Sequence, residues 1–325
     1  MKRVGRANEI LVRPNRFSSP IVFSDGIGSS GKRMLGHILS SFAGIEKMSH
    51  HFVFDYVGEL HWLGKMSDDA AQTYLQIEAD LQIYQLMLSR DQNFRPGDTT
   101  SVFSNANPWR YIWRLFFREG DSVVERIRKE RPWLHEAPHD GLRKANLYFS
   151  AFGDRLRIVH IVRNPIDLVA DLIRRGFDWR VGVDPREFQF TFLRNQVPIP
   201  IALRKLDLDF AEIKPSDLAA LTVQESMKQN LAGFRDLGKS DRARVKILYF
   251  DDFCEDPKRE VVGLSKFLGV SPTLRTKRVV RRENLPRDLP DRANILSSFG
   301  SQMTDVGISA LDEAMSTYQE FQKCS

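Results

Sequence analysis

The feature that most constrains the fold is a glycine-rich loop between an apolar segment and a helical one. Residues 20–24 (PIVFS) are apolar enough for a buried strand, and residues 34–42 carry apolar side chains at helical spacing. The loop at residues 26–33 (GIGSSGKR) contains three glycines and two serines. Glycines let the backbone curl so that successive N–H groups point at one anion, and the helix N-terminus and Lys32 add positive charge. This segment therefore predicts an anion-binding loop between a strand and a helix.

Three further apolar segments predict buried strands. Residues 156–162 (LRIVHIV) and 245–250 are continuous apolar runs bounded by polar residues. Residues 46–55, which include the apolar run at 52–54, are expected to form another strand. Strands of continuous hydrophobicity that alternate with helices are typical of a parallel sheet covered on both faces.

The predicted fold is an α/β three-layer sandwich, with a central parallel sheet and helices on both faces. Helical patterns occupy residues 67–88, 109–117, 122–129, 165–175, 218–237 and 257–268. We expect one domain over residues 1–325, with helical insertions at about 60–131 and 180–240. The basic segment 275–287 (RTKRVVRRENLPR) is expected to be a surface loop that is either solvated or a lip over an anionic ligand, with nucleic acid as a third option.

Composition excludes several classes of protein. Two cysteines, Cys254 and Cys324, are too few for a disulfide framework and favour a reducing compartment. No uncharged apolar run approaches the ~20 residues that span a bilayer, and the N-terminus lacks the apolar segment of a signal peptide. We therefore expect a cytoplasmic protein without a membrane span. The net charge of +6 is small for a protein that coats nucleic acid, so no nucleic-acid partner is expected.

Two positions bear on the kind of anion. The loop fits the nucleotide-binding pattern G-x-x-x-x-G-K-[ST] except that Arg33 replaces the Ser or Thr whose hydroxyl would hold Mg²⁺. A kinase or NTPase would therefore lack its first metal ligand. Arg163 ends the strand at 156–162, where open α/β sheets bind ligands, and its planar guanidinium suits a phosphate. The alternative for Arg163 is a salt bridge to Asp167 or Asp171.

Three segments together resemble the sulfotransferases that use 3′-phosphoadenosine 5′-phosphosulfate (PAPS). They are residues 29–35 (SSGKRML), residues 158–169 (IVHIVRNPIDLV) and residues 247–253 (ILYFDDF) with the following Pro257 and FLG at 267–269. The resemblance implies metal-free, in-line transfer of a sulfuryl group from PAPS to a hydroxyl. A glycan or glycolipid acceptor is weakly preferred because residues 51–54 look like the glycan-acting branch. The alternatives are a P-loop kinase or NTPase, and a non-catalytic nucleotide-binding relative.

The resemblance also implies a donor site. Its residues would be Gly28, Ser29, Ser30, Gly31, Lys32, Arg33, Arg163 and Asp171, joined by Arg281 and Arg282 from the basic segment. Lys32 would stabilise charge on the departing phosphate oxygen. Two positions depart from the family pattern: Ser29 stands where the family has a basic residue, and Asp171 stands where it has a serine that contacts the 3′-phosphate.

For the acceptor side, either His50 or His51 would remove the acceptor proton. His135, Glu136 and His139 would line the acceptor site. These last three also spell H-E-x-x-H, the zinc-protease pattern, which requires an unbroken helix. Pro138 interrupts such a helix, so no metal is expected.

Three other features are expected to be structural. His160 alternates within a buried strand and is predicted to be a core histidine. Asp251 is predicted to cap a helix or form a salt bridge in a loop, rather than bind Mg²⁺. Four aromatic residues at helical spacing are predicted to be core rather than an acceptor platform: Trp109, Trp113, Phe116 and Phe117.

Overall fold

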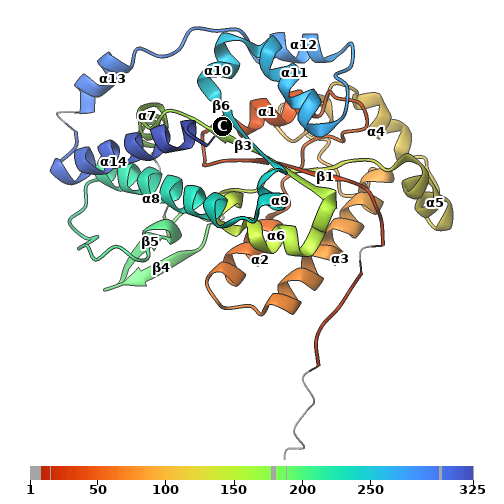
Figure 1. The fold of residues 1–325 in the computed structure, drawn as a ribbon, viewed down its shortest axis with the longest axis horizontal. Coiled ribbons are helices and arrows are strands. Elements are labelled where there is room, and N and C mark those ends of the chain that lie inside the picture. Colours follow the sequence, from red (N-terminus) through yellow and green to blue (C-terminus); the bar gives the residue numbers. More distant parts are fainter. Residues whose placement is uncertain (1–8, 15, 177–180, 188, 300–301, 325) are drawn as a thin grey trace, which may run out of the picture.

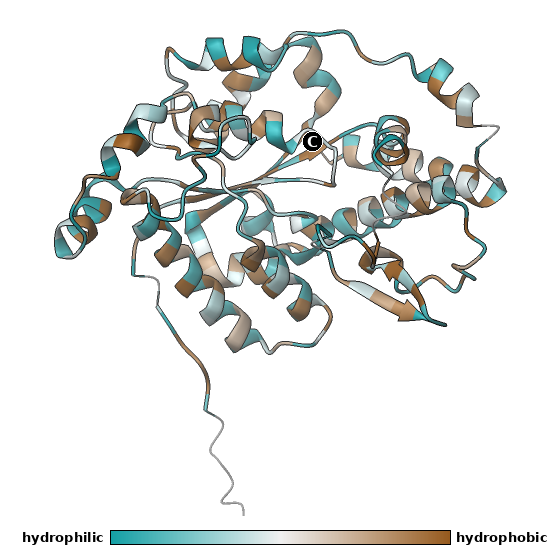
Figure 2. Cartoon of the chain, turned by 180° about the vertical axis from the view of Figure 1, so that it is seen from behind, coloured by the Kyte–Doolittle hydropathy of each residue, from teal (hydrophilic) through white to brown (hydrophobic). Residues whose placement is uncertain are grey.

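A four-stranded parallel sheet in the order β2-β1-β3-β6 forms the centre of the molecule (Figure 1). The computed structural model describes residues 9–14, 16–176, 181–187, 189–299 and 302–324. The strands are β1 (Ile21–Asp25), β2 (Leu134–Glu136), β3 (Leu156–Val162) and β6 (Val245–Tyr249). A separate antiparallel hairpin joins β4 (Thr191–Arg194) and β5 (Val197–Pro200). Figure 2 shows the hydrophobic colour of the central strands, which are covered on both faces.

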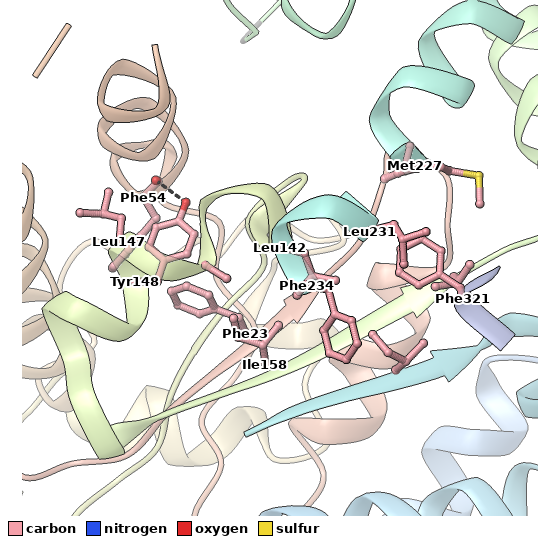
Figure 3. Close-up of a cluster of buried hydrophobic side chains, with 14 of the residues drawn as sticks. Phe23, Phe54, Leu142, Leu147, Tyr148, Ile158, Met227, Leu231, Phe234 and Phe321 are labelled. Carbon is pink, nitrogen blue, oxygen red and sulfur yellow. Dashed lines mark hydrogen bonds between the residues drawn. The ribbon is translucent and has the colours of Figure 1, made fainter. Parts of the chain in front are cut away.

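Alternate strand residues feed two hydrophobic cores, one on each face of the sheet. Phe23 and Ile158 face a core that also contains Tyr148, whose ring centroid lies 5.2 Å from that of Phe23 (Figure 3). Val22 and Val159, one residue away in each strand, face the other core. Because side chains of a strand alternate between faces, this arrangement requires helices on both sides.

The helices divide between these two cores. The Phe23 side is covered by α2 (Phe52–Trp62), α3 (Asp68–Met87), α6 (Ala145–Phe152), α7 (Pro165–Arg174), α8 (Pro215–Asp236) and α14 (Asp305–Gln322). The Val22 side is covered by α1 (Lys32–Leu39), α10 (Phe250–Glu255), α11 (Pro257–Leu268) and α12 (Thr276–Arg282). Shorter or peripheral helices are α4 (Pro108–Arg114), α5 (Asp121–Glu130), α9 (Lys239–Arg242) and α13 (Arg292–Phe299). The predicted α/β three-layer class is confirmed.

The strand predicted at residues 46–55 is wrong. Residues 45 and 49 form only isolated bridges, to Trp133 and Glu136, and helix α2 begins at Phe52. The buried residues of α2 include Phe54, Val57 and Gly58, which are three and four residues apart, so of the apolar run at 52–54 only Phe54 is buried, on a helical stripe. The short strand β2 pairs with β1 at the edge of the sheet. It therefore occupies the position next to β1 that the strand at 46–55 would have filled.

The prediction that the aromatic stripe at 109–117 is core is also wrong. The inner face of α4 carries Arg110, Tyr111 and Arg114, which surround the buried carboxylate of Glu46. Arg114 and Tyr111 cannot leave Glu46 without stranding a buried charge, so α4 cannot rotate to bury its aromatic side chains. These side chains are exposed on α4 and the turn that follows it: Trp109, Trp113, Phe116 and Phe117.

The basic segment at 275–287 is also not a loop throughout, because α12 occupies its first half. Val279 on this helix is buried in the core on the Val22 side. Within the described residues, no helix is both long enough and apolar enough to cross a bilayer.

The close approach of α8 to the segment that follows β2 yields a test of the fold. A Cβ at Gly233 would lie 2.3 Å from the carbonyl oxygen of Leu142 and 2.6 Å from the Cα of Arg143. Backbone atoms cannot move aside cheaply, so Gly233→Ala should lower the free energy of unfolding by about 1–3 kcal/mol, measured by urea denaturation. The control is Gly263→Ala inside α11, where the nearest atom is the Lys246 Nζ at 3.7 Å. This variant should be stabilised by roughly 0.5–1 kcal/mol, and equal effects of the two substitutions would contradict the packing.

Candidate active site

A cavity of about 540 Å³ opens beyond the carboxyl ends of β1 and β3. The two strands are in register, with Asp25 opposite His160, so the loops that follow them lie side by side. Other walls come from the segment before α2, residues 99–100, residues 137–139 and the segment between β6 and α13. This size and this place on an open parallel sheet are typical of a ligand site.

The glycine-rich loop forms the floor of the cavity. Gly26 and Gly31 have φ values of 149° and 104°. A Cβ at Gly26 would lie 2.7 Å from the Ile161 carbonyl oxygen, and one at Gly31 would lie 2.7 Å from the Phe250 ring, so only glycine fits at either position. The first hydrogen bond of α1 runs from the Leu35 N–H to the Gly31 carbonyl oxygen. The amides of residues 32–34 therefore remain available to an anion, as at other helix N-termini.

Lys32 joins the loop to the opposite wall. Its Nζ donates a hydrogen bond to the Pro138 carbonyl oxygen at 2.9 Å. Burial lowers the pKa of Lys32 to about 8, although the nearby carboxylates of Asp25, Asp55 and Asp140 oppose this shift. The ammonium is thus a buried charge whose protonation responds to pH near neutrality.

Two arginines lie close to the ring of Phe250. The guanidinium carbon of Arg163 lies 4.5 Å from the ring centroid, and that of Arg287 lies 5.0 Å from it. Arg163 also donates a hydrogen bond to the Ser29 carbonyl oxygen at 3.0 Å. Both side chains line the cavity, so two planar guanidinium groups from distant parts of the chain can meet one anion.

The predicted salt bridge of Arg163 is present but long. Its Nε lies 3.6 Å from an oxygen of Asp167. Arg292, at the start of α13, binds the same carboxylate at 2.9 Å and Asp251 at 2.8 Å. Arg292 therefore compensates the charge of Asp167. Asp251 forms a salt bridge, as predicted, but it lies in the first turn of α10 rather than in a loop, and it is not part of the cavity wall.

The electrostatic balance of the cavity is strongly positive. Its described walls include the side chains of Lys32, Arg33, Arg163, Arg175 and Arg287, against one carboxylate, that of Glu283. Although burial alone would raise it, the pKa of Glu283 is held below its usual value by the hydrogen bond and charge of His37, 2.7 Å away. The cavity therefore suits a ligand with several negative charges.

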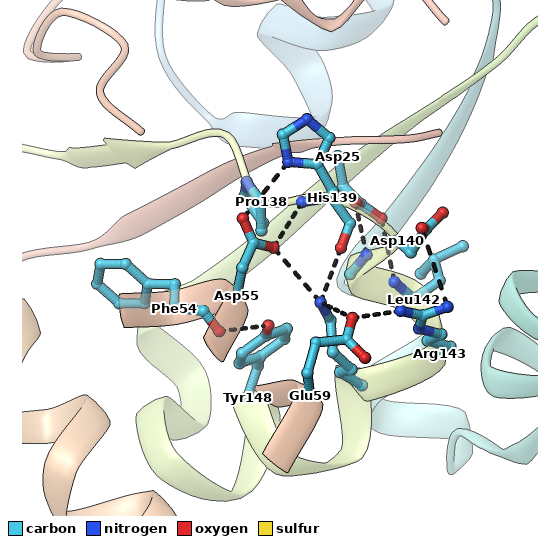
Figure 4. Close-up of polar contacts among 12 residues, drawn as sticks. Asp25, Phe54, Asp55, Glu59, Pro138, His139, Asp140, Leu142, Arg143 and Tyr148 are labelled. Atoms are coloured by element: carbon cyan, nitrogen blue, oxygen red, sulfur yellow. Dashed lines mark hydrogen bonds and ion pairs between the residues drawn. The ribbon is translucent and has the colours of Figure 1, made fainter. Parts of the chain in front are cut away.

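The opposite wall carries two histidines, His50 and His139, over the carboxylate of Asp55. Figure 4 shows the His139 side of this arrangement. Asp55 Oδ2 lies 2.9 Å from His50 Nε2 and 3.4 Å from His139 Nδ1, and Asp55 Oδ1 accepts the His139 backbone N–H at 2.8 Å. The two imidazole rings are 4.7 Å apart, centroid to centroid. Both histidines line the cavity, whereas Asp55 lies behind them.

Buried cations hold this wall in place. Lys144 Nζ lies 3.4 Å from Asp55 Oδ1 and 2.9 Å from Glu59 Oε1, and Arg143 also pairs with Glu59. Burial would raise the pKa of Asp55, but Lys144 and the hydrogen bonds from the two histidines hold it well below its ordinary value. Asp55 is therefore a carboxylate at neutral pH.

The same three side chains could coordinate a metal ion. One ligand atom each from His50, Asp55 and His139 lie within 4.8 Å of one another. However, the Lys144 ammonium already contacts Asp55, and Lys32 is close enough to lower the pKa of His139. These neighbouring positive charges disfavour a further cation at this cluster.

The structure brings many of the predicted residues to the cavity and leaves others away from it. Those on its walls are Gly28, Ser29, Gly31, Lys32, Arg33, Arg163, His50 and His139. Ser30 is buried beneath the loop, and Arg281 and Arg282 are exposed on α12 outside the cavity wall. Helix α12 buries Val279, which places Arg281 and Arg282 on its solvent side.

Asp171 does not face the cavity. Its carboxylate pairs with Arg174 and lies 2.8 Å from Arg175 Nε, and a hydrogen bond from Ser29 also helps to keep its pKa low despite burial. Asp171 therefore holds Arg175 at the cavity edge, and its negative charge is compensated there.

Three predicted residues do not line the cavity: His135 and Glu136, expected on the acceptor wall, and His51, one of the two expected bases. His135 is fully buried in β2, with its ring nitrogens 2.7 Å from Ser24 Oγ and 3.1 Å from Ser40 Oγ, and burial lowers its pKa to about 3. Glu136 is buried and lies 2.7 Å from His51 Nδ1. The two residues are in a strand, so the zinc-protease arrangement is absent from this described segment. His160 is a core histidine, as predicted, 2.6 Å from Asp25.

Other cavity residues were not predicted: Arg175, Phe250, Arg287, Thr99 and Thr100 on its walls, and Asp55 behind them. Arg287 belongs to the basic segment but lies after α12, and it is this part of the segment, together with Glu283, that lines the cavity. Asp55 was not predicted as a site residue because its segment was expected to be a strand, whereas it lies in helix α2.

Comparison with solved structures finds sulfotransferases, the family that the sequence motifs resemble. The sulfotransferase domain of the Synechococcus PCC 7002 olefin synthase has 14% sequence identity and a TM-score of 0.48, covering 97% of this chain and 98% of that chain. Sulfotransferase STF9 from Mycobacterium avium has 15% identity and a TM-score of 0.46, covering 95% of this chain and 77% of that chain. The sulfotransferase domain from the curacin biosynthetic pathway has 12% identity and a TM-score of 0.45, covering 94% and 91%. No family model and no curated protein matches the sequence.

The buried ammonium of Lys32 predicts pH-dependent anion binding. Because the pKa of Lys32 is about 8, raising the pH through this value removes a positive charge from the cavity wall. Affinity for sulfate, which keeps its own charge throughout, should fall as the pH rises from 7 to 9, measured by calorimetry. Lys32→Met should bind sulfate more weakly at pH 7 and lose most of this pH dependence. A wild-type affinity that stays constant would contradict the role of Lys32.

Proposed function

We propose that this protein is a sulfotransferase that moves a sulfuryl group from PAPS to a hydroxyl of a glycan or glycolipid. The observation that carries the proposal is the pairing of two walls in one cavity. One wall has the glycine loop and five cations, and the other has two histidines over a buried carboxylate. The first suits a doubly phosphorylated donor, and the second suits the removal of a proton from an acceptor.

The donor would lie along the loop and the arginine pair. The amides at the start of α1 and Lys32 would hold the 5′-phosphosulfate, because they form the loop and its positive end. Arg163 and Arg287, which both contact the Phe250 ring and line the cavity, would bind the 3′-phosphate. Arg287 takes the role that the sequence had suggested for Arg281 and Arg282.

The transfer needs little covalent help from the protein. The acceptor oxygen forms a bond to sulfur while the bond from sulfur to the 5′-phosphate oxygen breaks, and the electron pair leaves with that oxygen. Lys32 would stabilise this developing charge, and the loop would keep the reacting atoms in line.

His50 would accept the acceptor proton. Its Nε2 lies at hydrogen-bond distance from Asp55, which orients the ring and stabilises the imidazolium that forms. His139 is a weaker base, because burial and Lys32 lower its pKa to about 4. His139 would instead help to position the acceptor hydroxyl.

Aromatic side chains next to His50 support a sugar acceptor. The ring of Phe52 lies 4.6 Å from that of His50 and 5.8 Å from that of Tyr56, with which it is stacked. Phe52 is 40% exposed and lies next to His50, although it is not itself part of the cavity wall. Flat aromatic faces of this kind pack against the apolar face of a ring-shaped ligand.

The kinase alternative is less well supported. Arg33 occupies the place of the hydroxyl that would hold Mg²⁺, and Asp251 is bound by Arg292. Among the described residues that line the cavity, the one carboxylate is Glu283, which is compensated by His37. Transfer activity should therefore persist in the presence of EDTA.

Binding of adenosine 3′,5′-bisphosphate tests the donor site. In metal-free buffer, Arg163→Ala and Arg287→Ala should each weaken binding by about 1.5–3 kcal/mol, or roughly 10- to 150-fold, because each removes hydrogen bonds to a charged group. Arg281→Ala is the matched control and should leave calorimetric affinity unchanged. An absence of binding by the wild-type protein, together with binding of Mg·ATP, would refute the sulfotransferase proposal.

Turnover tests the base. His50→Asn should reduce kcat by about 10²- to 10⁴-fold while leaving the affinity for adenosine 3′,5′-bisphosphate intact, because it removes general-base catalysis alone. His51→Asn, whose ring pairs with Glu136 away from the cavity wall, is the control. If His139→Asn abolished turnover and His50→Asn did not, the base would be His139.

A further inference from the structure

The two positions at which the sequence departs from the family pattern, Ser29 and Asp171, contact each other in the structure. Ser29 belongs to the glycine loop, and Asp171 lies on α7, far away in the chain. The Asp171 carboxylate accepts a hydrogen bond from the Ser29 side chain. Neither side chain has a role in the transfer proposed for this cavity, so their contact needs a physical explanation of its own.

Ser29 adopts a backbone conformation that is unfavourable for its residue type. Its φ of 70° lies in the left-handed region, which residues other than glycine seldom occupy. Its carbonyl oxygen accepts a hydrogen bond from Arg163 at 3.0 Å, and its side chain donates to Asp171. Such a conformation persists where the surrounding contacts fix it. These two contacts therefore attach the loop to α7 and to the residue that precedes this helix.

Asp171 also fixes the position of Arg175. The Arg175 Nε lies 2.8 Å from Asp171 Oδ2, and residues four positions apart lie on the same side of a helix. Arg175 is part of the cavity wall, whereas Asp171 is buried and is not among the described residues that line the cavity. The carboxylate therefore holds a cation at the cavity wall, while its own negative charge stays behind that wall.

Arg163 and Arg175 are connected through the same loop residue. Arg163 precedes α7 and Arg175 follows it, yet both line the cavity. Arg163 contacts Ser29 directly, and Arg175 is connected to Ser29 through Asp171. Two guanidinium groups held beside one loop residue can bind a single phosphate together, since each offers several N–H donors in one plane.

We propose that Arg175 is a further ligand of the donor's 3′-phosphate and that Asp171 is the residue that positions it. The inference rests on the proposed function and adds a determinant of specificity to it. Arg175 binds only a nucleotide that carries the 3′-phosphate, so it increases the preference of the cavity for such a nucleotide. Asp171 acts on the ligand through Arg175 and does not touch it.

The opposite role for Asp171 would be repulsion. A carboxylate close to an anion site weakens anion binding if it acts on the ligand directly, because like charges repel. Removing its charge would then strengthen binding. If Asp171 instead positions Arg175, removing its charge weakens binding, because the guanidinium is no longer held at the cavity wall. The sign of the effect of Asp171→Asn therefore separates the two roles.

Calorimetry with two nucleotides tests the role of Arg175. The wild type should bind adenosine 3′,5′-bisphosphate at least about tenfold more tightly than adenosine 5′-phosphate. Arg175→Ala should weaken binding of the bisphosphate by about 3- to 10-fold and leave that of the monophosphate unchanged. The matched control is Arg174→Ala, which should keep the wild-type ratio of affinities. Arg174 pairs with the same carboxylate but is 75% exposed and is not part of the cavity wall.

A second pair of variants tests the role of Asp171. Asp171→Asn should weaken bisphosphate binding by about threefold, and it should have no further effect in the Arg175→Ala background, because Asp171 acts through Arg175. Tighter bisphosphate binding by Asp171→Asn, or the wild-type ratio of affinities in Arg175→Ala, would overturn the inference and leave the donor site standing. A wild-type protein with no preference for the bisphosphate would refute the donor site itself, and the inference with it.

Discussion

A single buried carboxylate, that of Asp25, joins the parts of the molecule on which the cavity depends. Asp25 is the last residue of β1 and accepts hydrogen bonds from the backbone N–H groups of Gly141 and Leu142, at 2.7 and 3.1 Å. It also lies 2.6 Å from His160 on β3. The burial of Asp25 would raise its pKa, but His160, Lys32 and these hydrogen bonds hold it below its ordinary value. The Asp25 carboxylate therefore fixes the positions of three elements relative to one another: the glycine loop that follows it, β3, and the segment that carries His139.

The elements that could be predicted from the sequence are those determined by local pattern. The strand at 156–162 and the helix at 257–268 match the structure at both ends, because a continuous apolar run and a proline at the first helical turn are local signals. The glycine loop was equally clear, since Gly26 and Gly31 adopt backbone angles that other residues rarely reach.

The features that escaped prediction depend on partners far away in the chain. The aromatic stripe of α4 has the periodicity of a core helix, and Glu46, more than sixty residues earlier, reverses its orientation. Asp55 contacts His50 and His139, which belong to different segments of the chain. The sequence separation between Asp55 and either histidine matches no known motif. The residue type alone does not tell whether a histidine is structural or lines the cavity. His135 and His160 are buried in strands, whereas His50 and His139 face the cavity.

The position of Phe250 has a consequence for how the protein is made. The Phe250 ring packs against Gly31 and contacts the guanidinium groups of Arg163 and Arg287. The proposed donor site therefore combines residues from the first tenth and the last eighth of the chain. During synthesis, a nascent chain that has emerged only as far as β3 would possess the glycine loop and Arg163 but neither Phe250 nor Arg287. Domains generally fold as units during synthesis. A nascent chain that has not yet exposed Phe250 and Arg287 would therefore lack part of the proposed donor site, and the complete cavity would form only after both residues have left the ribosome.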